Sequence, residues 1–428
     1  MVMSIPFSAR LVDLVNLVVA KGGNFLLAIL VFGVMSRSMN ESSFSEFGYW
    51  WSIALMVGGV LFGGISATLI RLVSIHGSLL SHVRSLLTSL AIGLLLLGGL
   101  GIIVILWLGY DFEATCLLLA VGGFGVAMQF QAMLLSLLRA ACATAATIRA
   151  SVAWVISVPL CLWTFSFQET DLSRIFLWMA LAMAIGFGVA AWVSGPSLWR
   201  LFSTQPSSSG SQESLVRNTA SFVAVNFFSF AFVNIDFTLF REIGTASEYS
   251  AMAAVKIFFE RFALPLMLVF SGAVSMRVLR QPDGGAGGQR GINISIRRNL
   301  YSVFTLIALI IGLTVAYQVL TPLFTQREVA LTPVLSGIVV AGYVLYMLNG
   351  VFWDVLVLRK STRGILWRTS GLLIGYAFLQ YFSIRNYGIS GWAIGWFLAN
   401  LVVTLVLLRG GVIAYRMREG AMPSKISS

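Results

Sequence analysis

Long apolar segments recur along the whole chain, and they restrict its fold more than any other feature of the sequence. A helix of about 20 apolar residues spans the hydrocarbon core of a bilayer, and such segments follow one another from end to end. Of the 428 residues, 58% are hydrophobic and only 10% are charged. That composition leaves too little polar surface for a soluble globular protein. We therefore predict an all-α polytopic membrane protein.

The apolar segments predict about twelve transmembrane helices. A polar stretch rich in serine, Thr204–Ser211, separates the first six from the last six and has the composition of a flexible linker. The predicted domains are a six-helix half at 1–203, a cytoplasmic linker at 204–215, a six-helix half at 216–414 and a cytoplasmic tail at 415–428. The predicted helices cover 11–35, 47–70, 86–109, 114–138, 149–167, 172–199, 216–241, 247–276, 300–324, 329–357, 365–382 and 389–414.

Basic residues in the loops predict the orientation of these helices. With the N-terminus in the cytoplasm, 20 arginines and lysines fall on the cytoplasmic side and 5 on the opposite side. Cytoplasmic loops carry such an excess of basic residues in most membrane proteins. We therefore place both termini in the cytoplasm and expect a bacterial inner membrane protein whose first apolar segment is a retained helix rather than a signal peptide.

The net charge of +12 comes from these scattered loop residues, so it does not indicate a nucleic-acid partner. Cys116, Cys142 and Cys161 have no metal or redox spacing, and the two histidines, His76 and His82, lie in a predicted loop. We predict neither a metal site nor a cofactor.

Ionisable residues inside predicted helices are candidates for function, because burying them in a bilayer is costly. The first helix carries Lys21 and Asn24 on or beside one polar face, with Lys21 near mid-membrane. We interpret both as substrate-binding residues that face a polar cavity. The alternatives are that Lys21 pairs with an acid in the bundle or extends toward the cytoplasmic surface.

The predicted eighth helix is the most charged. Lys256 and Glu260 lie one turn apart and can pair, and Arg261 follows them. We expect Lys256 and Arg261 to bind an anionic substrate, since a guanidinium group suits phosphate. Asp236, on the predicted seventh helix, can pair with Lys21, Lys256 or Arg261, or take up a coupling ion. Asp236 and Glu260 are therefore predicted coupling or charge-pairing residues.

Glycines in the predicted second helix favour close helix packing. Gly58, Gly59, Gly63 and Gly64 include one pair at the spacing that lets two helices approach closely.

No catalytic constellation is evident, so we predict that the protein is not an enzyme. Asp111 with Glu113, or Glu169 with Asp171, would have to supply the paired acids of a glycosyltransferase. Their short loops leave no room for an acceptor-binding domain, and we interpret them as solvated loop charges.

Several short motifs together resemble a known family. Phe44–Tyr49 leads into the second helix, which ends at Gly64–Arg71. Glu248–Ala253 opens the eighth helix, and Tyr387–Ala393 lies near the C-terminus. In this order the motifs resemble those of the Wzx-type polysaccharide flippases of the MOP (multidrug/oligosaccharidyl-lipid/polysaccharide exporter) superfamily. The chain departs from the family pattern in having Glu248 where glycine is frequent, and in lacking a proline after the eighth helix.

This resemblance implies two six-helix lobes around a central cleft that is lined by the first, second, seventh and eighth helices. It implies alternating access and an undecaprenyl-diphosphate-linked oligosaccharide, flipped from the cytoplasmic to the periplasmic leaflet for surface polysaccharide such as O-antigen or exopolysaccharide. Expected partners are that lipid-linked oligosaccharide, membrane lipid, H⁺ or Na⁺ as coupling ion, and polysaccharide polymerase machinery. The alternatives are a cation-coupled drug or metabolite antiporter of the same superfamily and, less favoured, a membrane glycosyltransferase or polymerase.

Overall fold

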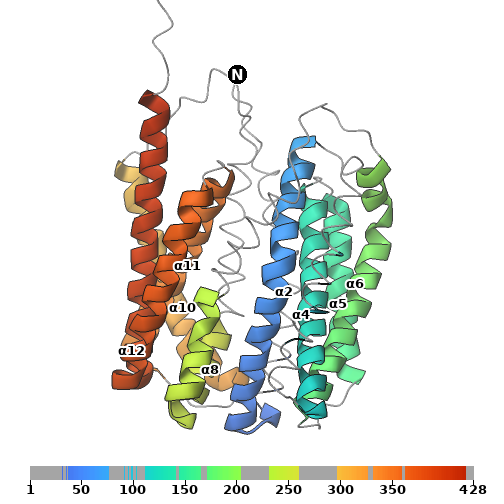
Figure 1. Cartoon of the computed structure of the whole chain (residues 1–428), viewed down its shortest axis with the longest axis horizontal. Coiled ribbons are helices and arrows are strands. Elements are labelled where there is room, and N and C mark those ends of the chain that lie inside the picture. Colours follow the sequence, from blue (N-terminus) through green and yellow to red (C-terminus); the bar gives the residue numbers. More distant parts are fainter. Residues whose placement is uncertain are drawn as a thin grey trace, which may run out of the picture. The chain divides into compact units, whose positions relative to one another are not determined.

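The computed structural model consists of helices throughout the part of the chain that it describes (Figure 1). It describes residues 31, 35, 37–76, 91, 95, 98–99, 103, 111–140, 144–164, 171–203, 231–259, 296–325, 331–358 and 362–420. The chain divides into two compact units, Met1–Pro265 with Leu323–Arg327, and Leu266–Pro322 with Glu328–Ser428. The predicted domain boundary at 204–215 lies outside the described residues and stays a prediction.

The described part of unit 1 contains four long helices that pack side by side: α2 (Glu41–His76), α4 (Phe112–Ala140), α5 (Thr144–Thr164) and α6 (Leu172–Ser203) (Figure 1). A helical segment at 231–243 and α8 (Ala246–Phe258) follow, and α8 packs on α2.

An aromatic cluster lies in the core of unit 1. Phe47 and Trp51 of α2, Phe124 of α4 and Phe176 of α6 are all essentially unexposed. The Trp51 and Phe124 rings lie 4.7 Å apart between centroids, and those of Phe47 and Phe176 lie 5.4 Å apart. Such tilted and offset ring pairs add to the stabilisation that comes from burial alone. The cluster therefore ties three helices together near the N-terminal end of α2.

Close packing of α2 on α4 follows from two glycines. A Cβ atom on Gly125 would lie 2.0 Å from the carbonyl oxygen of Ala54, and one on Gly58 would lie 2.3 Å from the carbonyl oxygen of Gly125. Only glycine leaves room for backbones this close. The sequence pointed to close packing in this helix, and the structure adds that the partner of Gly58 is Gly125.

The described helices of unit 2 are α10 (Ile296–Thr325), all but the last turn of which belongs to this unit, α11 (Pro333–Leu358) and α12 (Thr362–Gly420). The α12 helix is interrupted at Gly388, whose φ of 54° and ψ of −135° are not helical. Its two parts correspond to the predicted helices 365–382 and 389–414. A Cβ atom on Gly391 would lie 2.1 Å from the carbonyl oxygen of Ser383, so the chain packs on itself closely at this break.

The described helices have apolar outer surfaces, as a bilayer requires. Among the described residues, three segments are long and apolar enough to cross a membrane: Phe112–Leu135, Leu172–Arg200 and Gly371–Leu407. Large apolar side chains such as Trp192, Phe382 and Ile311 are more than half exposed, which suits contact with lipid rather than water. The predicted class, an all-α polytopic membrane protein, is confirmed.

Polar residues at the helix starts accept hydrogen bonds from backbone groups that have no partner within the helix. Asp111 Oδ1 accepts from Ala114 N at 2.8 Å, and Asn40 Oδ1 accepts from Ser43 N at 2.8 Å. Asp171 Oδ1 accepts from Ser173 N, and Thr332 Oγ1 accepts from Leu335 N. In the predicted topology all these helix starts lie on the outer side of the membrane.

Candidate functional site

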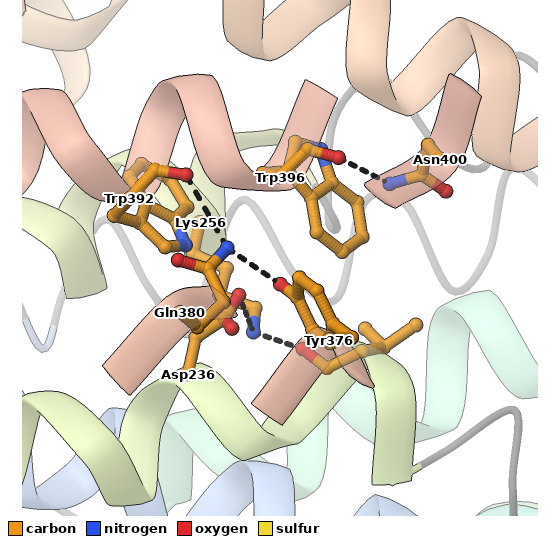
Figure 2. A network of polar contacts seen from close by, with 8 residues as sticks. Asp236, Lys256, Tyr376, Gln380, Trp392, Trp396 and Asn400 are labelled. Carbon is orange, nitrogen blue, oxygen red and sulfur yellow. Dashed lines mark hydrogen bonds and ion pairs between the residues drawn. The ribbon is translucent and has the colours of Figure 1, made fainter. Parts of the chain in front are cut away.

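A fully buried ion pair joins helix 231–243 to α8. Lys256 Nζ lies 3.3 Å from Asp236 Oδ2, and neither side chain has any exposed surface (Figure 2). Lys256 also donates to the carbonyl oxygen of Val233 and lies over the ring of Phe237, with Nζ 4.8 Å from the ring centroid. The ammonium group is therefore held by one face of helix 231–243.

The sequence explains why these groups converge. Val233, Asp236 and Phe237 are spaced by three and four residues, so they share one face of a helix. A tight turn at Gly244, where a Cβ atom would lie 2.7 Å from the Phe240 ring, connects this helix to α8. The turn brings Lys256 back against the face that carries Asp236.

The start of α8 is fixed by a capping box. Thr245 Oγ1 accepts from Glu248 N, and the Glu248 side chain accepts in return from Thr245 N. This reciprocal pair satisfies two backbone N–H groups at the helix start. Glu248, which departs from the family pattern, thus has a structural role here.

Each member of the buried pair depends on the charge of the other. Removing either charge from a buried ion pair leaves the other unpaired in a medium of low dielectric constant, which costs several kcal/mol. The sequence left three partners open for Asp236, and the structure pairs it with Lys256.

The other predicted site residues, Lys21, Asn24, Glu260 and Arg261, lie outside the described residues. The predicted roles in substrate binding and coupling stay predictions for all six residues.

A second charged cluster, which sequence reasoning missed, joins α2 to helix 231–243 and α8. Arg241 Nε lies 3.1 Å from Glu46 Oε1, and the Arg241 guanidinium lies 4.5 Å from the centre of the Tyr49 ring. The Tyr249 hydroxyl donates to the carbonyl oxygen of Ser45 at 3.1 Å. All of these residues except Arg241 lie within the motifs that carried the family resemblance. Those motifs were therefore the sequence feature that could have pointed to this cluster.

Unit 2 contains a separate polar cluster without charge. Gln380 Nε2 donates to the Tyr376 hydroxyl at 2.9 Å and to the Trp392 carbonyl oxygen at 3.3 Å, and Asn400 Nδ2 donates to the Trp396 carbonyl oxygen at 2.9 Å (Figure 2). All five side chains are buried. The bond from Gln380 to Trp392 connects the two parts of α12. The three bonds together satisfy polar groups that lipid could not, so we interpret the cluster as structural.

Within the described part of the chain, no group of three or more histidine, cysteine or acidic side chains could hold a metal ion. Two of the four acids that an enzymatic alternative would use have structural roles. Asp111 and Asp171 accept hydrogen bonds from the first turns of α4 and α6. Glu113 is exposed, and Glu169 lies outside the described residues.

No protein-family model matches the chain, and no curated protein matches it. Solved structures do match it over nearly its whole length. One is the inward-facing conformation of a multidrug resistance MATE family transporter of the MOP superfamily, with 16% identity, a TM-score of 0.55 and coverage of 94% of this chain and 96% of that chain. A MATE transporter from Vibrio cholerae matches with 15% identity, a TM-score of 0.59 and coverage of 95% and 97%.

A third match is a MOP superfamily transporter from Pyrococcus furiosus, at 16% identity and a TM-score of 0.56, covering 96% of each chain. That protein is described as having a binding pocket of reverse polarity that suggests a different function. The helices and these matches define a membrane protein with a transporter fold. More particularly, the chain has the fold of the MATE transporters of the MOP superfamily.

Proposed function

We propose that the protein is an ion-coupled secondary transporter that works by alternating access. The observation that carries this proposal is the ion pair of Lys256 and Asp236, which lies fully buried within a transporter fold. Transporters place their substrate and ion sites near the bilayer midplane and move helices around them. Buried membrane charges with a specific partner mark such sites.

In the proposed cycle, Asp236 neutralises Lys256 while no substrate is bound. An anionic group on the substrate, or a proton or Na⁺ at Asp236, then replaces one member of the pair. Lys256 is released to the substrate while Asp236 takes up the coupling ion, and the reverse exchange resets the transporter. Lys21 and Arg261 would add cations to the same site, with Asn24 as a neutral donor and Glu260 as a second acid.

One substrate class is an undecaprenyl-diphosphate-linked oligosaccharide, flipped across a bacterial inner membrane to supply the polysaccharide polymerase machinery. Cations near the midplane can replace the hydration of the diphosphate, which otherwise could not enter hydrocarbon. The motif resemblance and the buried Lys256 support this class. In the Pyrococcus furiosus transporter, the reverse polarity of the binding pocket suggests a different function, so this fold is not tied to one substrate class.

The second class is a drug or metabolite exported in exchange for a cation. The matching structures favour it over the flippase, because the Vibrio cholerae protein and the inward-facing protein are both MATE transporters, and the latter is a multidrug resistance transporter. Asp236 would then be the acid that binds the cationic drug or the coupling ion.

Two growth assays distinguish the substrates. The gene is expressed in a strain that lacks its polysaccharide flippase and, separately, in a drug-sensitive strain that lacks its exporters. Restored surface polysaccharide supports the flippase, whereas a raised inhibitory concentration of cationic drugs supports the antiporter. Either activity should be lost when Lys256→Met and Asp236→Leu are combined. Retention of full activity by the combined variant, at equal membrane abundance, would overturn the role of the pair.

A further inference from the structure

The charged cluster at the start of α2 joins segments from the two predicted six-helix halves. Ser45, Glu46 and Tyr49 belong to the first half, and Arg241 and Tyr249 belong to the second. In the predicted topology, all five residues lie at the outer ends of their helices. We call this set the outer cluster.

The outer cluster lies above the buried ion pair along α8. Tyr249 and Lys256 are seven residues apart and so share one face of the helix, with Lys256 about 10 Å deeper at ~1.5 Å per residue. On α2, Ser45 and Ser52 have the same spacing, and Ser52 is buried. The outer cluster therefore covers the faces that lead from the outer membrane surface toward Lys256.

We propose that the outer cluster is a latch that closes the outer entrance to the site, an inference that rests on the proposed alternating access. When the two halves move apart at their outer ends, Arg241 must leave both Glu46 and the Tyr49 ring. Tyr249 must leave the Ser45 carbonyl oxygen at the same time. The conformation described here is then the one with the outer entrance closed.

The chemistry of the contacts suits a latch that opens in each cycle. The Glu46 and Arg241 side chains are 29% and 38% exposed, so water can replace each partner when they separate. Pairs with this exposure are weakly stabilising, in contrast to fully buried pairs. The latch therefore favours the conformation with a closed outer entrance but still allows the entrance to open.

The test measures access of a thiol reagent from outside, without substrate. Cys116, Cys142 and Cys161 are replaced by serine, and Ser52→Cys is introduced as the reporter. A membrane-impermeant maleimide is added to right-side-out membrane vesicles. We expect Glu46→Arg or Arg241→Glu alone to raise the labelling rate about two- to fivefold, the shift that a partly exposed ion pair supports. The double exchange, Glu46→Arg with Arg241→Glu, should restore the slow rate.

A second reporter separates the latch from general loosening. Ser194→Cys lies in α6 at a fully buried position away from the outer cluster, and its labelling should stay slow in every variant. Unchanged labelling at Ser52→Cys in both single variants, no restoration by the double exchange, or a parallel rise at Ser194→Cys would overturn the proposal. The labelling experiment measures no transport, so its result is independent of the two transport assays. The latch proposal can be overturned while transport is demonstrated, and it can be supported while both transport assays are negative.

Discussion

Lys256 and Asp236 form a contact of 3.3 Å between two side chains that have no exposed surface. The carboxylate comes from helix 231–243 and the ammonium from α8, so the pair holds together two helices that run in opposite directions. Continued burial of both charges depends on each keeping a partner of opposite charge. This dependence yields a prediction about stability.

Replacing one member of the pair should destabilise the protein, whereas replacing both should not. We expect Lys256→Met alone to lower the free energy of unfolding by about 3–5 kcal/mol, because it leaves the Asp236 carboxylate buried without its partner. Lys256→Met with Asp236→Leu should return it to within about 1 kcal/mol of the parent, because apolar replacements of a buried pair are tolerated. Thermal unfolding of the detergent-solubilised protein measures both.

The control for this prediction is Arg241→Gln, which removes a partly exposed pair and should change stability by less than about 1 kcal/mol. A single Lys256→Met variant as stable as the parent would contradict the buried pairing. Equal losses in the single and double variants would contradict it as well.

The packing of α2 on α4 predicts that two glycines of α4 differ sharply in how much their replacement by alanine destabilises the protein. Gly125→Ala should destabilise by about 1–3 kcal/mol, because its Cβ atom would lie 2.0 Å from the Ala54 carbonyl oxygen and force the helices apart. Gly122→Ala is the matched control, since its Cβ atom meets nothing within 4 Å. It should be neutral or stabilising, because alanine favours helix. Thermal unfolding would contradict the packing if both variants behaved alike.

Much of this architecture could be predicted from the sequence because it is local. Apolar length predicts the spans, and the caps that the structure adds at Asp171 and Thr245 are also made between neighbouring residues. Burial cost alone singled out Lys256 and Asp236. The choice between their possible partners was not predictable, since it depends on which helix faces approach each other in space.

The outer cluster shows the same limit more strongly. Tyr249 donates to a backbone oxygen 204 residues away, at Ser45, and every residue has such an oxygen. Nothing in the side-chain pattern identifies that acceptor. Gly58 likewise indicates that another helix packs closely, but the sequence does not identify Gly125 as its partner. The type of a residue therefore indicates that its side chain needs a contact. Which residue supplies that contact depends on how the helices pack.

Gly388 predicts a position where only glycine is well tolerated. Its φ of 54° with a ψ of −135° is a conformation that other residues adopt at a cost of about 1–3 kcal/mol. Gly388→Ala should therefore lower the midpoint of thermal unfolding, whereas Gly375→Ala, in open space within the same element, should not. Equal midpoints for the two variants would show that the break in α12 does not require the positive φ.

The start of α6 predicts a pH-dependent contribution to stability. The hydrogen bond from the Ser173 side chain, with backbone bonds from Ser173 and Arg174, lowers the pKa of Asp171 below its ordinary value. A carboxyl group whose pKa is lower in the folded state stabilises fully above its unfolded pKa of about 4, and this stabilisation is lost as pH falls through the folded pKa.

Asp171→Ala should therefore cost about 1 kcal/mol at neutral pH through loss of the cap, and less at pH 3. Asp171→Asn is the matched control, because the amide oxygen can still accept from Ser173 N but cannot titrate in this range. Unfolding midpoints of the three proteins between pH 3 and pH 7 measure this. The stability difference between the parent and Asp171→Asn should shift in favour of the parent as pH rises. A difference that does not change over this range would mean that the carboxylate charge contributes nothing to the start of α6.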